Sequence, residues 1–177
     1  MNEERHNEWR SPGQEPGQTP RKDFRSKKAM LSVWWDRRGP IFWELLENGR
    51  TVDSDVYCRQ LDATRRALRN RRVPIEFLDD NAKPHRSRQT LAKIQEMGWG
   101  HLEHAPYSPD MAPSDYYLFR SLEHWLRGKK FKTIDEMHCS LTGFFNSKSR
   151  DWYRRGFLQL EEQWEKVIES GGEYFDY

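Results

Sequence analysis

Cysteine is scarce in this sequence, and long apolar runs are absent from it. The 177 residues include two cysteines, Cys58 and Cys139, which lie far apart and form no CxxC pair. A disulfide framework and a zinc site are therefore not expected. No apolar segment approaches the roughly 20 residues that span a bilayer, and the N-terminal residues MNEERHNEWR are too polar for a signal peptide. These features predict a cytosolic or nuclear protein with reduced thiols and no membrane partner.

The sequence also lacks an excess of charge of either sign. Its 30 lysine and arginine residues nearly balance 28 aspartate and glutamate residues, which leaves a formal net charge of +2. The overall charge therefore does not identify a nucleic-acid-binding protein, and only the local placement of charge could do so. Eight tryptophans and seven tyrosines supply large apolar surface. A folded chain with an aromatic-rich core is expected.

Two parts of the chain differ in composition. Residues 1–28 are polar, basic and rich in proline and glycine, without hydrophobic periodicity, which is typical of an extended arm or loop. Residues 29–177 carry the periodic patterns of a folded domain. The total length suits one ordinary domain rather than two.

Hydrophobic patterns in residues 29–177 predict strands and helices in alternation. The predicted elements are a hairpin with strands at 30–35 and 41–46, a helix at 54–70, a strand at 73–78, a helix at 87–97, a possible short strand at 101–106, helices that begin near 114 and 133, and a last helix with an apolar stripe from 153 to 168. The helix near 133 starts with a capping-box pattern. This order predicts an α/β fold with parallel crossover connections.

Two aspartates are the candidate catalytic and metal-binding residues. Asp80 ends a predicted strand, where ligand sites gather in open α/β sheets, and Asp115 lies in the first turn of a predicted helix. Each also has an ordinary interpretation, as a turn residue or as a partner of the helix dipole. The 34 residues between them leave room for a helix, a strand and a loop that return Asp115 to the side of Asp80. Two converging carboxylates suit Mg²⁺ or Mn²⁺, which support phosphodiester chemistry in pairs.

Basic residues cluster in two places. Beyond Asp80 they are Lys83, His85, Arg86 and Arg88, and in the arm they include Arg21, Lys22, Lys27 and Lys28. The first cluster could contact phosphates near a cleavage site or form the solvated start of a helix. The second could bind nucleic acid or serve only as a soluble linker.

Several segments resemble the mariner family of DNA transposases. LDDNAKPH around Asp80 is similar to a motif in which an aspartate precedes Asn-Ala-Arg/Lys-Pro-His, and YSPDMAPSDYYLF is similar to the segment of the third catalytic aspartate. The gap of 34 residues is also that of the family, and MLSVWWD, DSDVYCRQLD and WEKVIESGGEYF follow the same order. The resemblance implies an RNase H-like fold with a mixed sheet flanked by helices. It also implies metal-dependent DNA cleavage and strand transfer with Mg²⁺ or Mn²⁺, DNA as partner, a homodimer and a nuclear location.

The sequence departs from the family pattern at its start. The resemblance begins near Glu8, and residues 1–28 are similar to the loop that follows the first strand of the fold. The expectation is a fragment without the central first strand and its aspartate, which is inactive by itself. Whether the chain is an enzyme therefore stays open. The alternatives are a repurposed, non-catalytic nucleic-acid-binding module and the mariner portion of a SET-domain methyltransferase chimera.

Overall fold

The computed structural model describes residues 29–46 and 49–172. The predicted arm at residues 1–28 lies outside these ranges, with its basic residues Arg21, Lys22, Lys27 and Lys28, and the boundary between arm and domain stays a prediction. Among the helices in the described ranges, none is long and apolar enough to cross a membrane.

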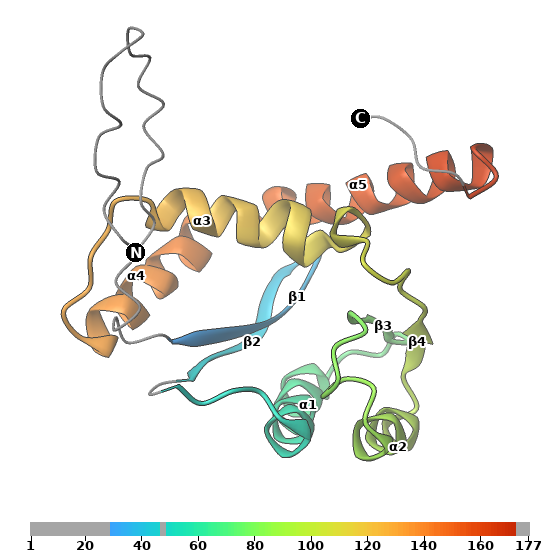
Figure 1. The fold of residues 1–177 in the computed structure, drawn as a ribbon, viewed down its shortest axis with the longest axis horizontal. Coiled ribbons are helices and arrows are strands. Elements are labelled where there is room, and N and C mark those ends of the chain that lie inside the picture. The colour runs from blue at the N-terminus through green and yellow to red at the C-terminus, as the bar shows by residue number, and fades with distance from the viewer. Residues whose placement is uncertain (1–28, 47–48, 173–177) are drawn as a thin grey trace, which may run out of the picture.

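A β-hairpin is the first element, as predicted. Strands β1 (Met30–Asp36) and β2 (Gly39–Leu46) pair antiparallel, with a register shift between Trp34 and Trp35 (Figure 1). Gly39 enters the second strand with a φ of 133°, a value that side chains with a Cβ rarely adopt. The turn therefore needs a glycine at this position.

A parallel strand–helix–strand unit follows the first helix. Helix α1 (Ser54–Leu68) is capped by Asp53, and helix α2 (Arg88–Met97) is capped by Ser87 and ends at Gly98. Strands β3 (Glu76–Leu78) and β4 (Gly100–Leu102) flank α2 and pair parallel. The crossover is confirmed, although both strands are shorter than the sequence predicted.

The C-terminal half is helical. Its elements are the 3-10 turn η1 (Pro109–Met111), the π-helical turn η2 (Ser114–Phe119), α3 (Arg120–Leu126), α4 (Ile134–Ser147) and α5 (Arg150–Glu169). The cap predicted at Thr133 is present, since its side chain accepts from the amide of Glu136. The Glu136 carboxylate accepts from the amide of Lys132 instead of that of the cap residue. The predicted helix starts are confirmed, but the π-helical geometry at Ser114 had no signal in the sequence.

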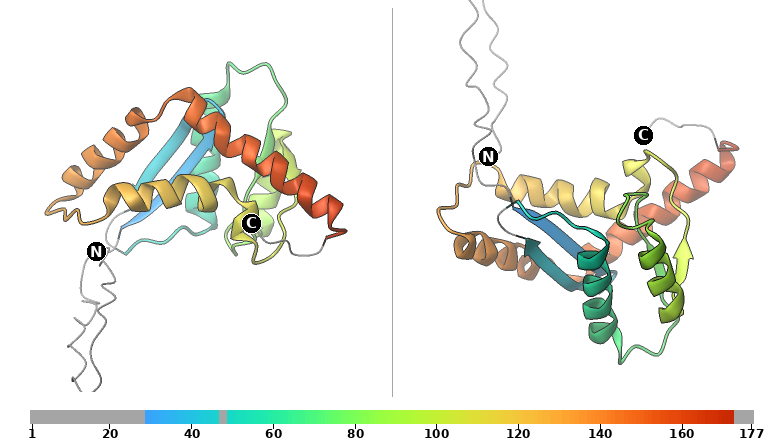
Figure 2. Two further views of the ribbon diagram at one scale, coloured as in Figure 1. Left: turned by 90° about the horizontal axis from the view of Figure 1, so that it is seen from above. Right: turned by 60° about the horizontal axis from the view of Figure 1, so that its bottom comes forward.

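Helices cover both faces of the hairpin. Helices α1 and α2 lie on one side, and α3, α4 and α5 lie on the other (Figures 1 and 2). Along β1, Leu31 and Val33 pack against the core cluster of α3 and α4, while Trp34 belongs to the cluster of α1 and α2. Successive side chains of a strand point to opposite faces, so a strand covered on both sides is apolar throughout. This explains the nearly continuous apolar run at residues 30–35, which Ser32 alone interrupts.

The four strands form two small sheets rather than one. Within the described ranges β1 pairs with β2 and β3 with β4, and no backbone pairing joins β1 to β3. Side chains connect the two sheets instead, because the ring of Trp34 stacks on Phe77 of β3 with centroids 5.4 Å apart. Trp34 and Phe77 share one core cluster with Tyr57, Leu61 and Ile94. The antiparallel and parallel pairings of the predicted mixed sheet are both present, divided between two sheets.

Candidate active site

Asp80 lies in the loop that follows β3, at the carboxyl end of the strand as predicted. Its side chain is 56% exposed, and Oδ1 accepts from the amide of Ala82 at 2.9 Å. The same oxygen lies 2.7 Å from Nδ1 of His85. That nitrogen is buried and makes no well-aligned hydrogen bond, so the contact with Asp80 is one of close approach. Asp80 therefore acts as a turn residue, and its carboxylate still faces outward.

Asp115 lies in the first turn of η2, and two contacts fix this turn against the rest of the molecule. The indole of Trp35 on β1 donates to the hydroxyl of Ser114 at 3.0 Å. The hydroxyl of Tyr116 donates to the carbonyl of Gly156 on α5 at 2.7 Å. The residues on either side of Asp115 are thus held by β1 and α5, while the Asp115 side chain is exposed.

The two aspartates lie within electrostatic range of each other. Although the residue as a whole is exposed, partial burial of its carboxyl raises the pKa of Asp115 above its ordinary value, and the negative charge of Asp80 raises it further. The charge of His104 acts in the opposite direction. The two carboxylates are therefore near enough for their charges to interact. Their functional assignment as catalytic and metal-binding residues stays a prediction.

A third aspartate, which the sequence analysis did not single out, is buried beside this pair. The Asp79 side chain is 4% exposed and accepts from the hydroxyl of Tyr57 at 3.1 Å and from Nε2 of His101 at 2.9 Å. Burial, then the charge of Asp79, raises the pKa of Tyr57, so this hydroxyl remains a donor. The signal was strand alternation, because Asp79 is two residues beyond the buried Phe77 and points to the same side. Asp79 anchors the strand end from which Asp80 projects.

The basic residues after Asp80 divide into two kinds. His85 stacks on Tyr57 with centroids 4.1 Å apart, and the guanidinium of Arg86 donates to Asn81 at 2.9 Å and lies 3.9 Å from Asp79. The side chains of His85 and Arg86 are therefore engaged in contacts with Tyr57, Asn81 and Asp79. Lys83 and Arg88 are exposed and point into solvent. Phosphate contacts from any of the four stay a prediction, and the geometry leaves Lys83 and Arg88 available for them.

The pair Asp80 and Asp115 fits a hard divalent cation with few protein ligands. Mg²⁺ keeps several waters and is commonly held by one or two carboxylates together with substrate phosphates. Repulsion between the two carboxylates is what such an ion would relieve. Across residues 29–46 and 49–172, no group of three or more His, Cys, Asp or Glu side chains is arranged to hold a metal. Clefts of about 520 and 570 Å³ border α1 and are lined by other residues, so the carboxylate pair lies outside both.

The sequence is similar to known transposase sequences. The family model for Transposase (partial DDE domain) matches residues 1–74. The Mariner Mos1 transposase of Drosophila mauritiana is 40% identical over 172 residues, which cover 93% of this chain and 50% of that protein. The Histone-lysine N-methyltransferase SETMAR of Homo sapiens is 35% identical over 182 residues, which cover 99% of this chain and 26% of that protein. The chain thus spans half or less of the length of these two curated relatives.

Solved structures of the Mos1 transposase match the fold. The catalytic domain with Raltegravir and Mg is 41% identical, with a TM-score of 0.80 over 85% of this chain and 78% of that one. The paired end complex with Mn is 40% identical, with a TM-score of 0.86 over 98% of this chain and 52% of that one. The fold is that of an RNase H-like catalytic domain, as the sequence predicted. The chain belongs to the mariner family of transposases and corresponds to part of the family's catalytic domain.

Proposed function

We propose that this chain is the part of a mariner-type transposase domain that supplies Asp80 and Asp115 to metal-dependent DNA cleavage and strand transfer. The observation that carries the proposal is the placement of these two carboxylates on different elements within electrostatic range of each other. The Mos1 structures with Mg and with Mn support a divalent cation, and the paired end complex supports DNA as partner. A homodimer and a nuclear location complete the proposal.

Each residue has a separate task in this function. Asp80 and Asp115 would hold the cation between β3 and η2, and Asp79 would keep the end of β3 in place through Tyr57 and His101. A bound Mg²⁺ or Mn²⁺ would polarise the phosphate and stabilise the charge on the leaving oxygen. The exposed Lys83 and Arg88 would hold the DNA backbone beside the pair.

Metal binding tests the site without requiring catalysis. Titration of the chain with Mn²⁺, followed by the electron paramagnetic resonance signal of the free ion, measures the bound fraction. We expect saturable binding that Asp80→Asn and Asp115→Asn each reduce strongly. Asp151→Asn, which removes an exposed carboxylate on α5, is the matched control for net charge. An equal loss of binding in all three variants would remove the basis for the site.

DNA cleavage by the 177-residue chain tests the second part of the proposal. Two described carboxylates offer few ligands, Mg²⁺ gives up its waters reluctantly, and a misplacement of about 1 Å can cost roughly 100-fold in rate. We expect weak, salt-sensitive DNA binding and no nicking of supercoiled plasmid or of a mariner-end duplex in Mn²⁺. Nicking by the parent chain that disappears in Asp80→Asn would show that the two carboxylates suffice.

A non-catalytic DNA-binding module is the second candidate function. The observation that favours it is that, in the part of the chain that the structure describes, no third His, Cys, Asp or Glu joins the carboxylate pair to form a metal-binding group. Unchanged DNA affinity on addition of Mn²⁺, together with no Mn²⁺ binding at the pair, would decide for this candidate. The similarity to SETMAR covers 26% of that protein, so methyl transfer is not proposed for these residues.

A further inference from the structure

A second charged surface lies at the opposite end of β3 from Asp80. The segment RRALRNRR, residues 65–72, contains five arginines and no acid, and it runs from the last turn of α1 into the loop before β3. Asp80 follows β3, whereas Arg71 and Arg72 precede it. The length of the strand therefore separates this segment from Asp80.

An ion pair joins this segment to the turn of the hairpin. Arg71, which is half-buried, forms an ion pair with Asp36 at the end of β1. Asp36 also accepts from the amide of Arg38 at 2.7 Å. This ion pair joins the turn, which carries the exposed Arg37 and Arg38, to the segment that carries the exposed Arg69 and Arg72. We call these four exposed residues, together with Arg71, the arginine patch.

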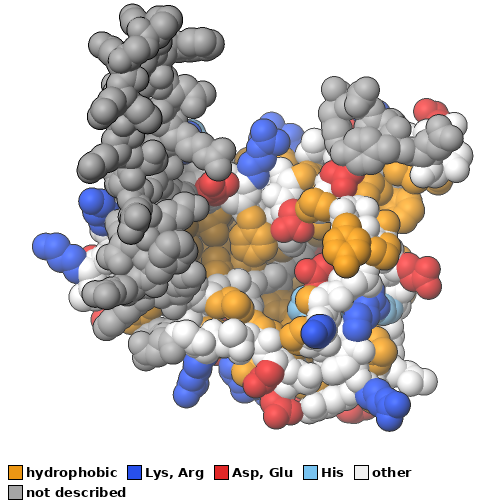
Figure 3. Space-filling view, viewed as in Figure 1, with side chains coloured by type: hydrophobic (Ala, Val, Ile, Leu, Met, Phe, Trp, Pro, Cys, Tyr) orange, Lys and Arg blue, Asp and Glu red, His pale blue; other side chains and the backbone are white. Residues whose placement is uncertain are grey.

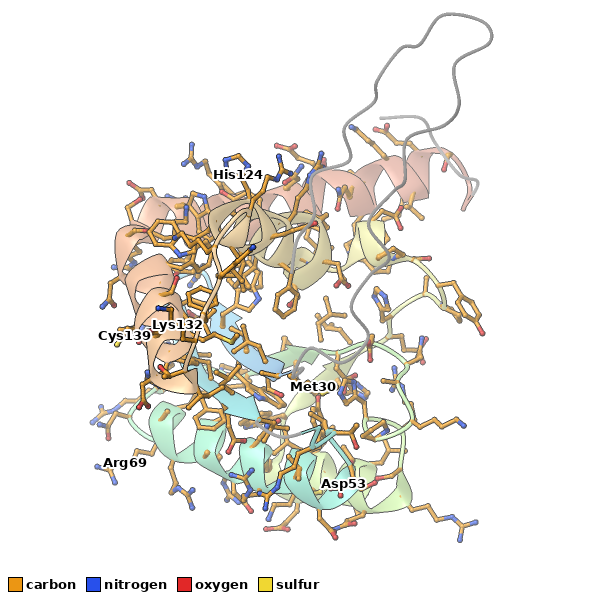
Figure 4. All side chains as sticks on the ribbon, turned by 60° about the vertical axis from the view of Figure 1, so that its left-hand side comes forward. Met30, Asp53, Arg69, His124, Lys132 and Cys139 are labelled. Carbon is orange, nitrogen blue, oxygen red and sulfur yellow. The ribbon has the colours of Figure 1, made fainter. Side chains whose placement is uncertain are left out.

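The arginine patch has a large local excess of positive charge. Asp36 is the one acid that pairs with it, and no other ion pair of its members is formed among residues 29–46 and 49–172. Figure 4 shows Arg69 at the end of α1 remote from Asp53, with its side chain directed away from the molecule. Over the region of α1 and α2 nearest the viewer in Figure 3, by contrast, acidic and basic side chains lie side by side.

Stabilisation of the helix does not explain the patch. Basic residues in the last turn of a helix interact favourably with its dipole, and Arg65 and Arg66 already occupy the last turn of α1. Arg72 lies beyond the helix, and Arg37 and Arg38 belong to another element. Five guanidinium groups close together repel one another, so a surface of this kind suits a polyanion. Arginine forms bidentate hydrogen bonds with phosphate, which lysine cannot form.

We propose that the arginine patch binds the phosphate backbone of duplex DNA, independently of sequence, at a site distinct from the carboxylate pair. The inference rests on the proposed function in taking DNA as the polyanion. It extends that function by giving the domain a second contact with duplex DNA, at the end of β3 that lies opposite Asp80. Neither metal nor cleavage is needed for this contact.

Fluorescence anisotropy of a labelled 30-bp duplex of arbitrary sequence, measured with the full chain in EDTA, tests the patch. The variant Arg37→Gln/Arg69→Gln/Arg72→Gln is compared with Arg150→Gln/Arg154→Gln/Arg155→Gln, which removes three exposed charges from α5. Each phosphate contact contributes about 0.9 to the slope of log affinity against log salt concentration. We expect the patch variant to lose two to three from the slope, roughly one unit per contact removed, and at least tenfold in affinity at 0.1 M salt. The control should lose less than twofold.

Two results would overturn the inference. Equal losses in the two variants would show that net charge alone governs binding, and no loss in the patch variant would show that DNA does not contact it. Loss of binding to a polyglutamate peptide, with duplex affinity unchanged, would assign the patch to an acidic protein instead. Circular dichroism melts establish that both variants fold. Because the assay contains no metal, its outcome is separate from that of the Mn²⁺ titration of Asp80 and Asp115.

Discussion

The ionisation of Asp115 opposes folding, because its carboxyl has a raised pKa in the native state. A carboxyl whose pKa is higher in the folded than in the unfolded state binds more protons when folded. Its contribution to the free energy of unfolding is therefore most favourable below the unfolded pKa, near 3.9, and declines as pH rises through the folded pKa. The side chain is exposed, so solvent screening keeps the effect small.

Removal of this charge should stabilise the chain at neutral pH. We expect Asp115→Asn to raise Tm at pH 7 by up to about 2 °C, with no gain at pH 3. Differential scanning calorimetry at the two pH values measures the change. Mn²⁺ should raise the Tm of the parent and leave that of Asp115→Asn unaltered. A gain at pH 3 as large as that at pH 7 would rule out ionisation as the cause.

Asp79 should matter more for stability than either of the exposed aspartates. Its buried carboxylate accepts from Tyr57 and from His101, and hydrogen bonds to charged groups contribute about 1.5–3 kcal/mol each. We expect Asp79→Ala to lower the free energy of unfolding by about 2–4 kcal/mol, since both donors lose their acceptor. Asp79→Asn keeps one acceptor and should cost about half as much. Urea denaturation measures both changes. A cost below about 0.5 kcal/mol for the alanine variant, as is usual for surface substitutions, would contradict this account.

Among the helices, Gly156 of α5 marks a close approach of three elements. A Cβ at this position would lie 2.8 Å from the ring of Tyr117 and 3.0 Å from that of Trp35. Alanine normally stabilises a helix interior by about 1 kcal/mol relative to glycine, but overpacking costs about 1–3 kcal/mol. We expect Gly156→Ala to destabilise the chain by about 1–2 kcal/mol in urea denaturation.

Gly143 of α4 provides the matched control. A Cβ there would meet Trp125 at 3.8 Å, which is ordinary van der Waals contact. Gly143→Ala should therefore stabilise the chain by about 0.5–1 kcal/mol. If both alanine variants change stability in the same direction, packing at Gly156 is not the deciding factor.

Elements with a strong local signal were predicted from the sequence. The caps at Asp53 and Ser87 and the stop at Gly98 lie at the expected helix ends, because capping depends on neighbours in the chain. The start of β3 was not predicted, since Val73 and Pro74 are apolar but exposed. The roles of Asp79 and His85 depend on contacts with Tyr57 of α1 and, for Asp79, also with His101 of β4, each at least 22 residues away in the chain. Local patterns carry no information about such contacts.

The strand edges bear on the stability of the whole molecule. In the described ranges β1 and β3 each have one edge without backbone pairing. Unpaired buried backbone groups cost about 1–3 kcal/mol each, which is large beside the roughly 5–15 kcal/mol that stabilises a domain. Open edges also promote association between chains.

We therefore expect the isolated chain to be marginally stable and to associate as its concentration rises. Its Tm should lie below about 65 °C, and size-exclusion chromatography coupled to light scattering should show a mass that increases with concentration. A soluble monomer with a sharp, cooperative melt above about 65 °C would contradict this expectation.

The division into two sheets has a consequence for how the molecule would respond to a cation. Asp80 is carried by the half that contains β3, β4, α1 and α2, and Asp115 by the half that contains η2 and α5, which is tied to β1 through Trp35. The seam between the halves is crossed by side-chain packing, with Trp34 stacked on Phe77, and not by backbone pairing in the described ranges. A cation bound by both Asp80 and Asp115 would link the two halves across this seam. Its binding would slow the breathing of both halves together, and amide exchange would fall in β1 as well as in β3.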